Sequence, residues 1–106
     1  MAERLIERRF MAHYIALIHK EPGTLYGVSF PDLPGVVTAG ESIDEAMEQA
    51  ADVLAFAAED WAHFNEEQFP TPRTIDDLRR DRRFLTDSVD AVVAAVPLRN
   101  TVAQPA

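Results

Sequence analysis

Apolar and polar residues alternate in three short segments near the start of the chain, which is the pattern of half-buried strands. The three segments are residues 12–19, 25–30 and 36–39. In the first segment, Ile15 and Leu17 share one face. Its other face carries Tyr14, Ala16 and Ile18. The turn-forming sequences EPGT and PDLPG separate the segments, so we predict a three-stranded antiparallel meander.

The next segment has helical periodicity. Its apolar residues form one stripe, made up of Ile43, Ala46, Met47, Ala50, Val53, Leu54, Ala57, Trp61 and Phe64. Ser42 and Glu45 have the spacing of a capping box, in which the Ser42 hydroxyl accepts from the Glu45 amide and the Glu45 carboxylate accepts from the Ser42 amide. The pattern predicts a long helix that packs this stripe on the sheet, with Trp61 among its large buried residues.

Two shorter elements are predicted further along. A short helix begins at Thr74, with Asp77 at the capping-box position and an Asp76–Arg80 pair in support. Residues 89–96 (VDAVVAAV) predict a fourth strand, buried on both faces except near its aspartate. The order of three strands, long helix, short helix and fourth strand predicts an α+β fold, with the long helix across one face of a single sheet.

The length of 106 residues and the share of hydrophobic residues, 47%, fit one globular domain. We expect a charged lead at residues 1–11, the folded domain at residues 12–96 and a short tail at residues 97–106. The chain has no Cys, which excludes disulfides, thiolate metal sites and cysteine nucleophiles. No apolar run approaches the ~20 residues of a membrane helix, and no signal peptide is recognisable. We therefore expect a cytoplasmic protein that does not contact membranes.

The net charge of −8 is concentrated in one block. Residues 21–72 contain eleven acidic residues and no Lys or Arg. Such a block repels a phosphate backbone, which argues against direct RNA binding, and it would suit a cationic partner. A solvated helix face is the alternative interpretation. Four arginines at 79, 80, 82 and 83 alternate with aspartates, and we interpret them as solvated ion pairs.

Phe56 departs from the apolar stripe. On a helical wheel it lies about 120° from the centre of the stripe, among Glu45, Gln49 and Asp52, where burial against the same sheet is awkward. One interpretation is a surface aromatic covered by a neighbouring loop. The other is a contact with a second subunit or a partner.

The sequence predicts no catalytic residue, no metal site and no cofactor. Two-metal phosphodiester cleavage needs several carboxylates that converge from strands, and the first strand has none. His13, His19 and His63 lack a metal-ligand spacing with a carboxylate pair. Ser29 and Ser42 have no assigned histidine base, and Ser42 is already explained as a helix cap.

Residues 27–54 (GVSFPDLPGVVTAGESIDEAMEQAADVL) resemble the N-terminal domain of HicB-type antitoxins. A glycine-aromatic strand, the PDLPG bend, a TAG-E-S helix start and an amphipathic helix with paired acids occur in the family's order. The matching positions are Tyr26, Gly27, Phe30, Pro31, Asp32, Leu33, Pro34, Gly35, Ala39, Gly40, Ser42 and Glu45. Most of these shape the fold. We expect Asp32, Glu45 and Glu48 to pair with cations of a partner, and Phe56 to act as an aromatic anchor.

The resemblance extends over residues 12–96. It implies a partial RNase H-like fold and an antitoxin that binds and occludes a small basic HicA-type toxin, which cleaves messenger RNA. A stand-alone HicB-like module that binds a protein or small ligand, and an RNase H-like nuclease, are the alternatives. Many members of the family carry a C-terminal DNA-binding segment; nothing suitable follows Val96, so we do not expect DNA binding. We also expect a homo-oligomer.

Overall fold

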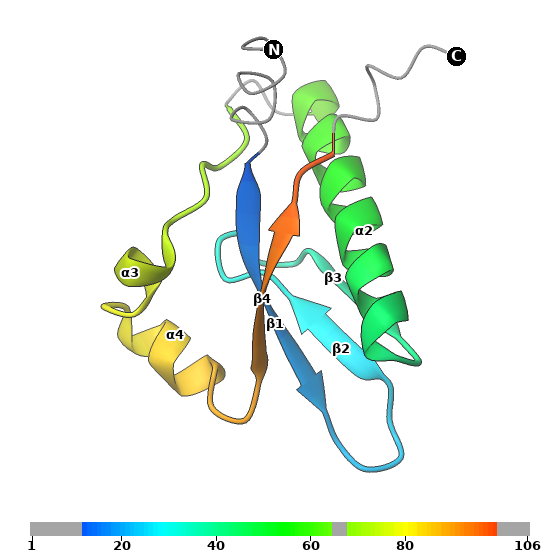
Figure 1. Ribbon diagram of the computed structural model, residues 1–106. Coiled ribbons are helices and arrows are strands. Elements are labelled where there is room, and N and C mark those ends of the chain that lie inside the picture. Colours follow the sequence, from blue (N-terminus) through cyan, green and yellow to red (C-terminus); the bar gives the residue numbers. More distant parts are fainter. Residues whose placement is uncertain (1–11, 65–67, 100–106) are drawn as a thin grey trace, which may run out of the picture.

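A computed structural model describes residues 12–64 and 68–99 (Figure 1). The elements in chain order are β1 (His13–Lys20), β2 (Tyr26–Ser29), β3 (Val37–Gly40), α2 (Ile43–Phe64), α3 (Ile75–Leu78), α4 (Arg82–Asp87) and β4 (Val92–Pro97). The predicted charged lead at residues 1–11 lies outside the described residues. Strand β4 extends through Pro97, and the backbone amide of Leu98 donates to the Ala12 carbonyl at 2.8 Å, so the first residues of the predicted tail are part of the sheet region.

The four strands form one antiparallel sheet in the order β3-β2-β1-β4. Strands β1, β2 and β3 make the predicted meander. Strand β4 returns to pair with β1, with Tyr14 opposite Val96 and Ile18 opposite Val92. The α+β class is thus confirmed, and the assignment to a partial RNase H-like fold stays a prediction.

One face of the sheet packs against α2. The predicted face of β1 with Tyr14, Ala16 and Ile18 lies in this core. Ala46, Ala50 and Leu54 of α2 are fully buried against it. The small side chains at the first two positions let the helix backbone approach the strands closely.

The other face of the sheet is covered as well, which the sequence does not predict. Leu17, on the second face of β1, packs with Leu78 of α3 and Phe84 of α4. Figure 1 shows α2 on one side of the sheet and α3 and α4 on the other. The predicted single short helix is therefore two helices, because Asp81 caps a second one by accepting from the Arg83 amide at 2.9 Å.

Helix α2 has the predicted bounds, but its two ends are less buried than predicted. At 22 residues it is ~33 Å long, longer than its neighbouring four-residue strands β2 and β3 can cover. Ile43 is 38% exposed. Trp61 is half-buried, and its ring packs edge-on against Phe69 with centroids 5.7 Å apart. The prediction that Trp61 is one of the large buried residues is therefore wrong.

The start of α2 is a tight connection from β3. The Glu45 amide donates to the Ser42 hydroxyl at 3.0 Å, as the capping box predicts. The Glu45 carboxylate, however, accepts from the amide of Glu41, one residue earlier than predicted. A Cβ on Gly40 would lie 2.5 Å from the Ala46 backbone nitrogen, so only glycine allows this close approach.

The arginines at 79, 80, 82 and 83 are exposed, as predicted. Arg80 lies 3.9 Å from Asp77, and Arg83 lies 3.7 Å from Asp87. Arg80 thus pairs three residues back, with Asp77, and not with the predicted Asp76. Exposed pairs of this kind contribute little to stability.

Strand β4 differs from its prediction in start and burial. It begins at Val92, because Asp90 has a positive φ of 64° that bends the chain before the strand. Val92 is 52% exposed and Val93 is 44% exposed. The prediction of a strand buried on both faces is wrong, since β4 lies at the edge of the sheet. Among the described helices, none is long and apolar enough to cross a membrane.

Candidate functional site

The solvent side of α2 carries an acidic surface. We call its exposed residues the acidic face of α2; they are Asp44, Glu45, Glu48, Asp52, Phe56, Glu59 and Asp60. They lie roughly opposite Ala46, Ala50 and Leu54, so the packing of these three residues on the sheet turns them outward. The helix contains no Lys or Arg. The charged side chains that α2 itself contributes to this face therefore all have one sign.

Phe56 lies in the middle of this acidic face. Its side chain is 64% exposed, the largest exposed fraction among the apolar residues that stand out at the surface. Within the described chain no loop covers it, so the first interpretation of Phe56 is wrong. Asp52 lies one turn before it and Asp60 one turn after it. A large aromatic ring framed by acids suits contact with a partner that is both basic and apolar, and this contact stays a prediction.

The acidic residues differ in how free their carboxylates are. Glu45 uses one carboxylate oxygen to accept from the Glu41 amide. Asp52 lies 3.8 Å from the Arg99 guanidinium, and both side chains are well exposed. Glu48 makes no hydrogen bond or ion pair with any described residue. Glu48 is therefore the most available of the predicted cation-pairing residues.

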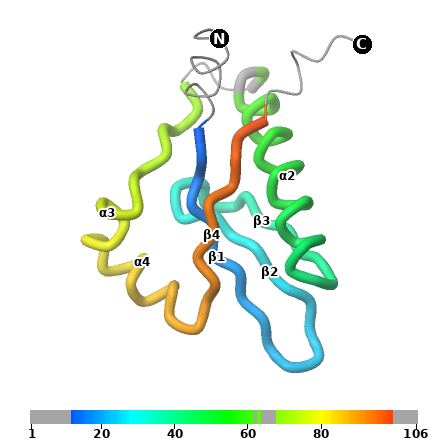
Figure 2. Tube along the Cα trace, viewed as in Figure 1, coloured from blue at the N-terminus to red at the C-terminus, as the bar shows by residue number. Residues whose placement is uncertain are grey.

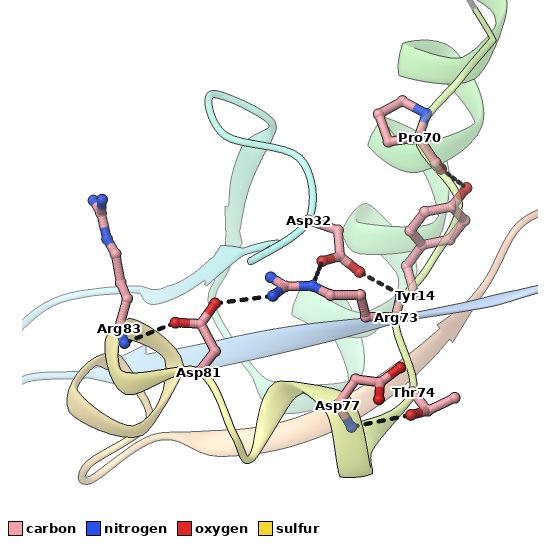
Figure 3. A network of polar contacts seen from close by, with 8 residues as sticks. All are labelled: Tyr14, Asp32, Pro70, Arg73, Thr74, Asp77, Asp81 and Arg83. Carbon is pink, nitrogen blue, oxygen red and sulfur yellow. Dashed lines mark hydrogen bonds and ion pairs between the residues drawn. The ribbon is translucent and has the colours of Figure 1, made fainter.

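Asp32 does not belong to this surface. Its side chain is only 7% exposed, and both oxygens accept from Arg73: Oδ2 from the backbone amide at 2.8 Å and Oδ1 from Nε at 2.6 Å. Figure 3 shows that the Arg73 guanidinium lies between Asp32 and Asp81, whose Oδ2 is 2.9 Å from Nη1. The prediction that Asp32 pairs with cations of a partner is wrong, because an arginine of its own chain already occupies the carboxylate.

This network ties the PDLPG bend to the segment that carries α3 and α4. Hydrogen bonds to Asp81 and then to Asp32 raise the pKa of Arg73. The hydrogen bond from the Arg73 side chain, and next the one from the Arg83 backbone amide, lowers the pKa of Asp81. Burial, and next the nearby charge of Asp32, raises the pKa of the Tyr14 hydroxyl, which donates to the Pro70 carbonyl at 2.6 Å. The network thus has a structural role.

A cavity of about 250 Å³ lies beside the network, between the PDLPG bend and α4. Leu17, Phe30 and Phe84 contribute to its apolar lining, together with Pro31 and Pro34 of the bend. Two ion pairs contribute its charged groups: Arg73 with Asp81 at 2.9 Å, and Arg83 with Asp87 at 3.7 Å. The cavity can hold a small group, but its paired charges are not directed at a ligand.

The described residues show no arrangement for metal or nucleophilic chemistry. In residues 12–64 and 68–99, no group of three or more His, Asp or Glu could hold a metal ion. The Nε2 of His19 lies 2.9 Å from the Asp87 carbonyl. The Ser42 hydroxyl accepts from the backbone amide of Glu45 at the start of α2. That the protein has no catalytic residue stays a prediction.

Two residues that organise this region are missed by reasoning from the sequence. Arg73 is the first Lys or Arg after Lys20. Its position after a long acidic segment indicates that one of those acidic residues pairs with it. Asp81 directly precedes α4, the position of a helix N-cap. Neither signal identifies Asp32 as the partner, because the pairing spans 41 positions in sequence.

The comparisons with known proteins agree with this fold. A family described as HicB-like antitoxin of bacterial toxin-antitoxin system matches residues 14–104. The chain is similar to the crystal structure of the Burkholderia pseudomallei antitoxin HicB, with a TM-score of 0.73 and 28% identity over 91% of this chain and 71% of that one. The N-terminal domain of that antitoxin gives a TM-score of 0.67 and 29% identity over 82% and 98% of the two chains.

A chain of a toxin-antitoxin complex from Streptococcus pneumoniae shares the fold, with a TM-score of 0.66 over 92% of this chain and 75% of that one. Its identity of 24% is too low to indicate more than the fold. A search of curated protein sequences found no match to the chain.

Proposed function

Because this chain belongs to the HicB-like antitoxin family, we propose that it neutralises a small basic HicA-type toxin, a ribonuclease that cleaves messenger RNA, by binding to it directly. The acidic face of α2 is the observation that carries this proposal. It combines exposed carboxylates, no Lys or Arg, and the exposed ring of Phe56 on one rigid helix. These are features of a surface that fits a basic protein.

In the proposed complex, the acidic face of α2 covers the toxin surface that binds RNA and competes with the phosphate backbone. Glu48 has a carboxylate that no described residue of its own chain occupies, so it pairs with a toxin cation. Glu45 adds charge at the helix start while it keeps its cap. Phe56 packs against an apolar patch of the toxin, where a desolvated ring slows dissociation.

A stand-alone module without a toxin partner is the second candidate. The cavity of about 250 Å³ beside Arg73 favours it, since binding sites for small molecules are concave and partly apolar. The cavity is slightly below the usual size of ~300–1,000 Å³ for such sites. A small basic reading frame beside this gene would support the antitoxin, and its absence would support the module.

Co-expression of this chain with the product of the neighbouring reading frame tests the proposed function. We expect the two proteins to purify as one complex, and the purified toxin to cut RNA only in the absence of this chain. The chain alone should not cut RNA with Mg²⁺ or Mn²⁺. RNA cleavage by the chain itself, abolished by substitution of an acidic residue, would contradict the proposal, as would failure of the two proteins to associate.

The proposed function implies a location in the cell and argues against RNA as a direct partner. Contact with the toxin takes place in the cytoplasm, where messenger RNA is. The charge of −8 opposes direct binding of RNA by this chain.

A further inference from the structure

The cavity between the PDLPG bend and α4 is built from segments that are far apart in the sequence. Strands β1 and β2 contribute Leu17 and Ser29, which lie opposite each other in the strand register and therefore point to the same face of the sheet. Figure 2 shows the loop after β2 on the same side of β1 as α3 and α4. Residues of the bend and of α4 complete the lining. The cavity therefore exists only in the folded chain.

The volume of the cavity, about 250 Å³, sets the size of a ligand. A cavity of ~150 Å³ lined by apolar side chains is large enough to bind benzene. The cavity beside α4 is larger than this, but it is smaller than the ~300–1,000 Å³ of sites for drug-sized molecules. It therefore fits a molecule built on a single ring or on two fused rings.

Rings form much of the apolar lining. Phe30 and Phe84 are almost completely buried, with 3% and 4% of their surface exposed, so close packing holds their rings in place. The pyrrolidine rings of Pro31 and Pro34 lie on the bend. Aromatic rings pack against one another edge-to-face or offset, and such pairs are more stable than their buried area alone implies. The lining therefore favours a planar aromatic ligand.

The charged groups of the cavity favour an uncharged ligand. Arg73 donates from Nε to Asp32 at 2.6 Å and from Nη1 to Asp81 at 2.9 Å. Arg83 lies 3.7 Å from Asp87. A charged ligand of either sign would lie beside a like charge and would compete with one of these ion pairs. A neutral ligand leaves both pairs intact.

The Ser29 hydroxyl is available to a ligand. It lines the cavity and makes no hydrogen bond with any described residue. Because a hydroxyl both donates and accepts, it can bond a phenolic hydroxyl or an indole N–H without breaking an existing contact. The side chains of Arg83 and Asp87 are 89% and 53% exposed, so the cavity is accessible from solvent beside them.

We propose that this cavity binds a small, uncharged aromatic molecule that carries one hydroxyl or N–H group, such as a phenol or an indole. The ring packs against Phe84 and the prolines of the bend, and its polar group bonds the Ser29 hydroxyl. A ring in this position contacts both the bend and α4, and so adds to the junction that Arg73 already holds together. A ligand that binds only the folded chain also raises its stability.

The cavity and the acidic face of α2 lie on opposite sides of the sheet. Leu17, in the cavity, belongs to the face that packs with α3 and α4, whereas α2 covers the other face. The inference thus goes beyond toxin binding and does not depend on it. It names the class of ligand for a stand-alone module, and it holds equally for an antitoxin whose α2 is occupied.

NMR titration of the full chain at neutral pH with phenol, benzoate and benzylammonium tests the proposal. We expect phenol to bind with a dissociation constant of about 0.1–1 mM. The shifts of backbone amides should saturate and should be confined to the cavity, at Leu17, Ser29, Phe30, Arg83 and Phe84. Benzoate and benzylammonium should bind at least about tenfold more weakly, because each brings an unpaired charge.

Two substitutions of Ser29 separate the role of the cavity volume from that of the hydroxyl. Ser29→Leu fills the cavity and should abolish binding of both phenol and toluene. Ser29→Ala should weaken phenol binding about three- to tenfold and leave toluene binding unchanged, because only phenol bonds the hydroxyl. Thr86→Leu is the matched control, since Thr86 is an exposed residue of α4 outside the cavity. It should leave both affinities unchanged.

Several results would overturn the proposal. They are shifts that do not saturate, shifts that spread to the exposed Val89 and Val92, and binding of benzoate or benzylammonium as tight as that of phenol. Equal loss of phenol and toluene binding in Ser29→Ala would overturn the role of the hydroxyl, and this comparison stands even if Ser29→Leu does not fold. No toxin is present in these experiments, so their outcome is separate from the test of the proposed function.

Discussion

The packing of α2 on the sheet can be tested by removing one buried side chain. Leu54 is fully buried and lies in the core with Tyr14 and Val96. Leu54→Ala deletes three carbon atoms and leaves a cavity whose cost is typically ~2–5 kcal/mol. One turn earlier on α2 lies Ala50, also fully buried, whose side chain is too short to fill the space. We therefore expect a cost in the upper part of that range, about 3–5 kcal/mol.

This loss is large compared with the stability of a small domain, ~5–15 kcal/mol. An unfolding entropy of ~2.1 cal/mol/K per residue corresponds to roughly 0.22 kcal/mol/K for a chain of this length, so the melting temperature should fall by about 13–23 °C. Urea titration followed by circular dichroism measures the free energy of unfolding directly. Phe56→Ala is the matched control: it removes a larger apolar side chain from the same helix, but one that is 64% exposed.

The control should change the free energy of unfolding by no more than ~0.5 kcal/mol. Equal losses for the two variants would refute the assignment of the buried and exposed sides of α2. A loss below ~0.5 kcal/mol for Leu54→Ala would show that α2 does not pack on the sheet as described.

Two further predictions concern the framework around the site. Gly40→Ala adds a methyl group 2.5 Å from the Ala46 nitrogen and should lower the melting temperature far more than Gly27→Ala, where the nearest atom is 3.9 Å away; equal effects would contradict the tight β3–α2 connection. Arg73 lowers the pKa of Asp81, so this carboxylate stabilises the fold fully above the unfolded aspartate pKa of ~3.9 and loses that effect as pH falls through its lower folded value. Asp81→Asn should therefore flatten the acid limb of a melting-temperature profile, and an unchanged profile would count against the network.

The parts of the fold that were predicted from the sequence depend on local periodicity. Alternation in β1 identifies both of its faces, and the apolar stripe gives the bounds of α2 without reference to distant residues. The burial of β4 was mispredicted because it depends on the order of the strands. Two valines in a strand look the same in sequence whether the strand is central or at an edge.

The candidate site shows the same limit. The acidic face follows from a helical wheel, and the exposure of Phe56 agrees with its position there. Asp32 was misassigned because its partner, Arg73, is 41 positions away and reaches it only through the fold. A carboxylate in a bend has the same sequence signature whether it points to solvent or to an arginine of its own chain.

The most direct test of the account measures how fast this chain associates with its toxin. Stopped-flow mixing at low and high salt compares the unsubstituted chain with Glu48→Lys, on the acidic face of α2, and with Asp76→Lys, an exposed residue of α3 on the opposite side of the sheet. Both substitutions change the net charge equally. We predict that Glu48→Lys slows association about tenfold at low salt, that high salt removes most of the difference, and that Asp76→Lys has a much smaller effect. Association that responds equally to the two substitutions, or to neither, would contradict the claim that the acidic face of α2 binds the toxin.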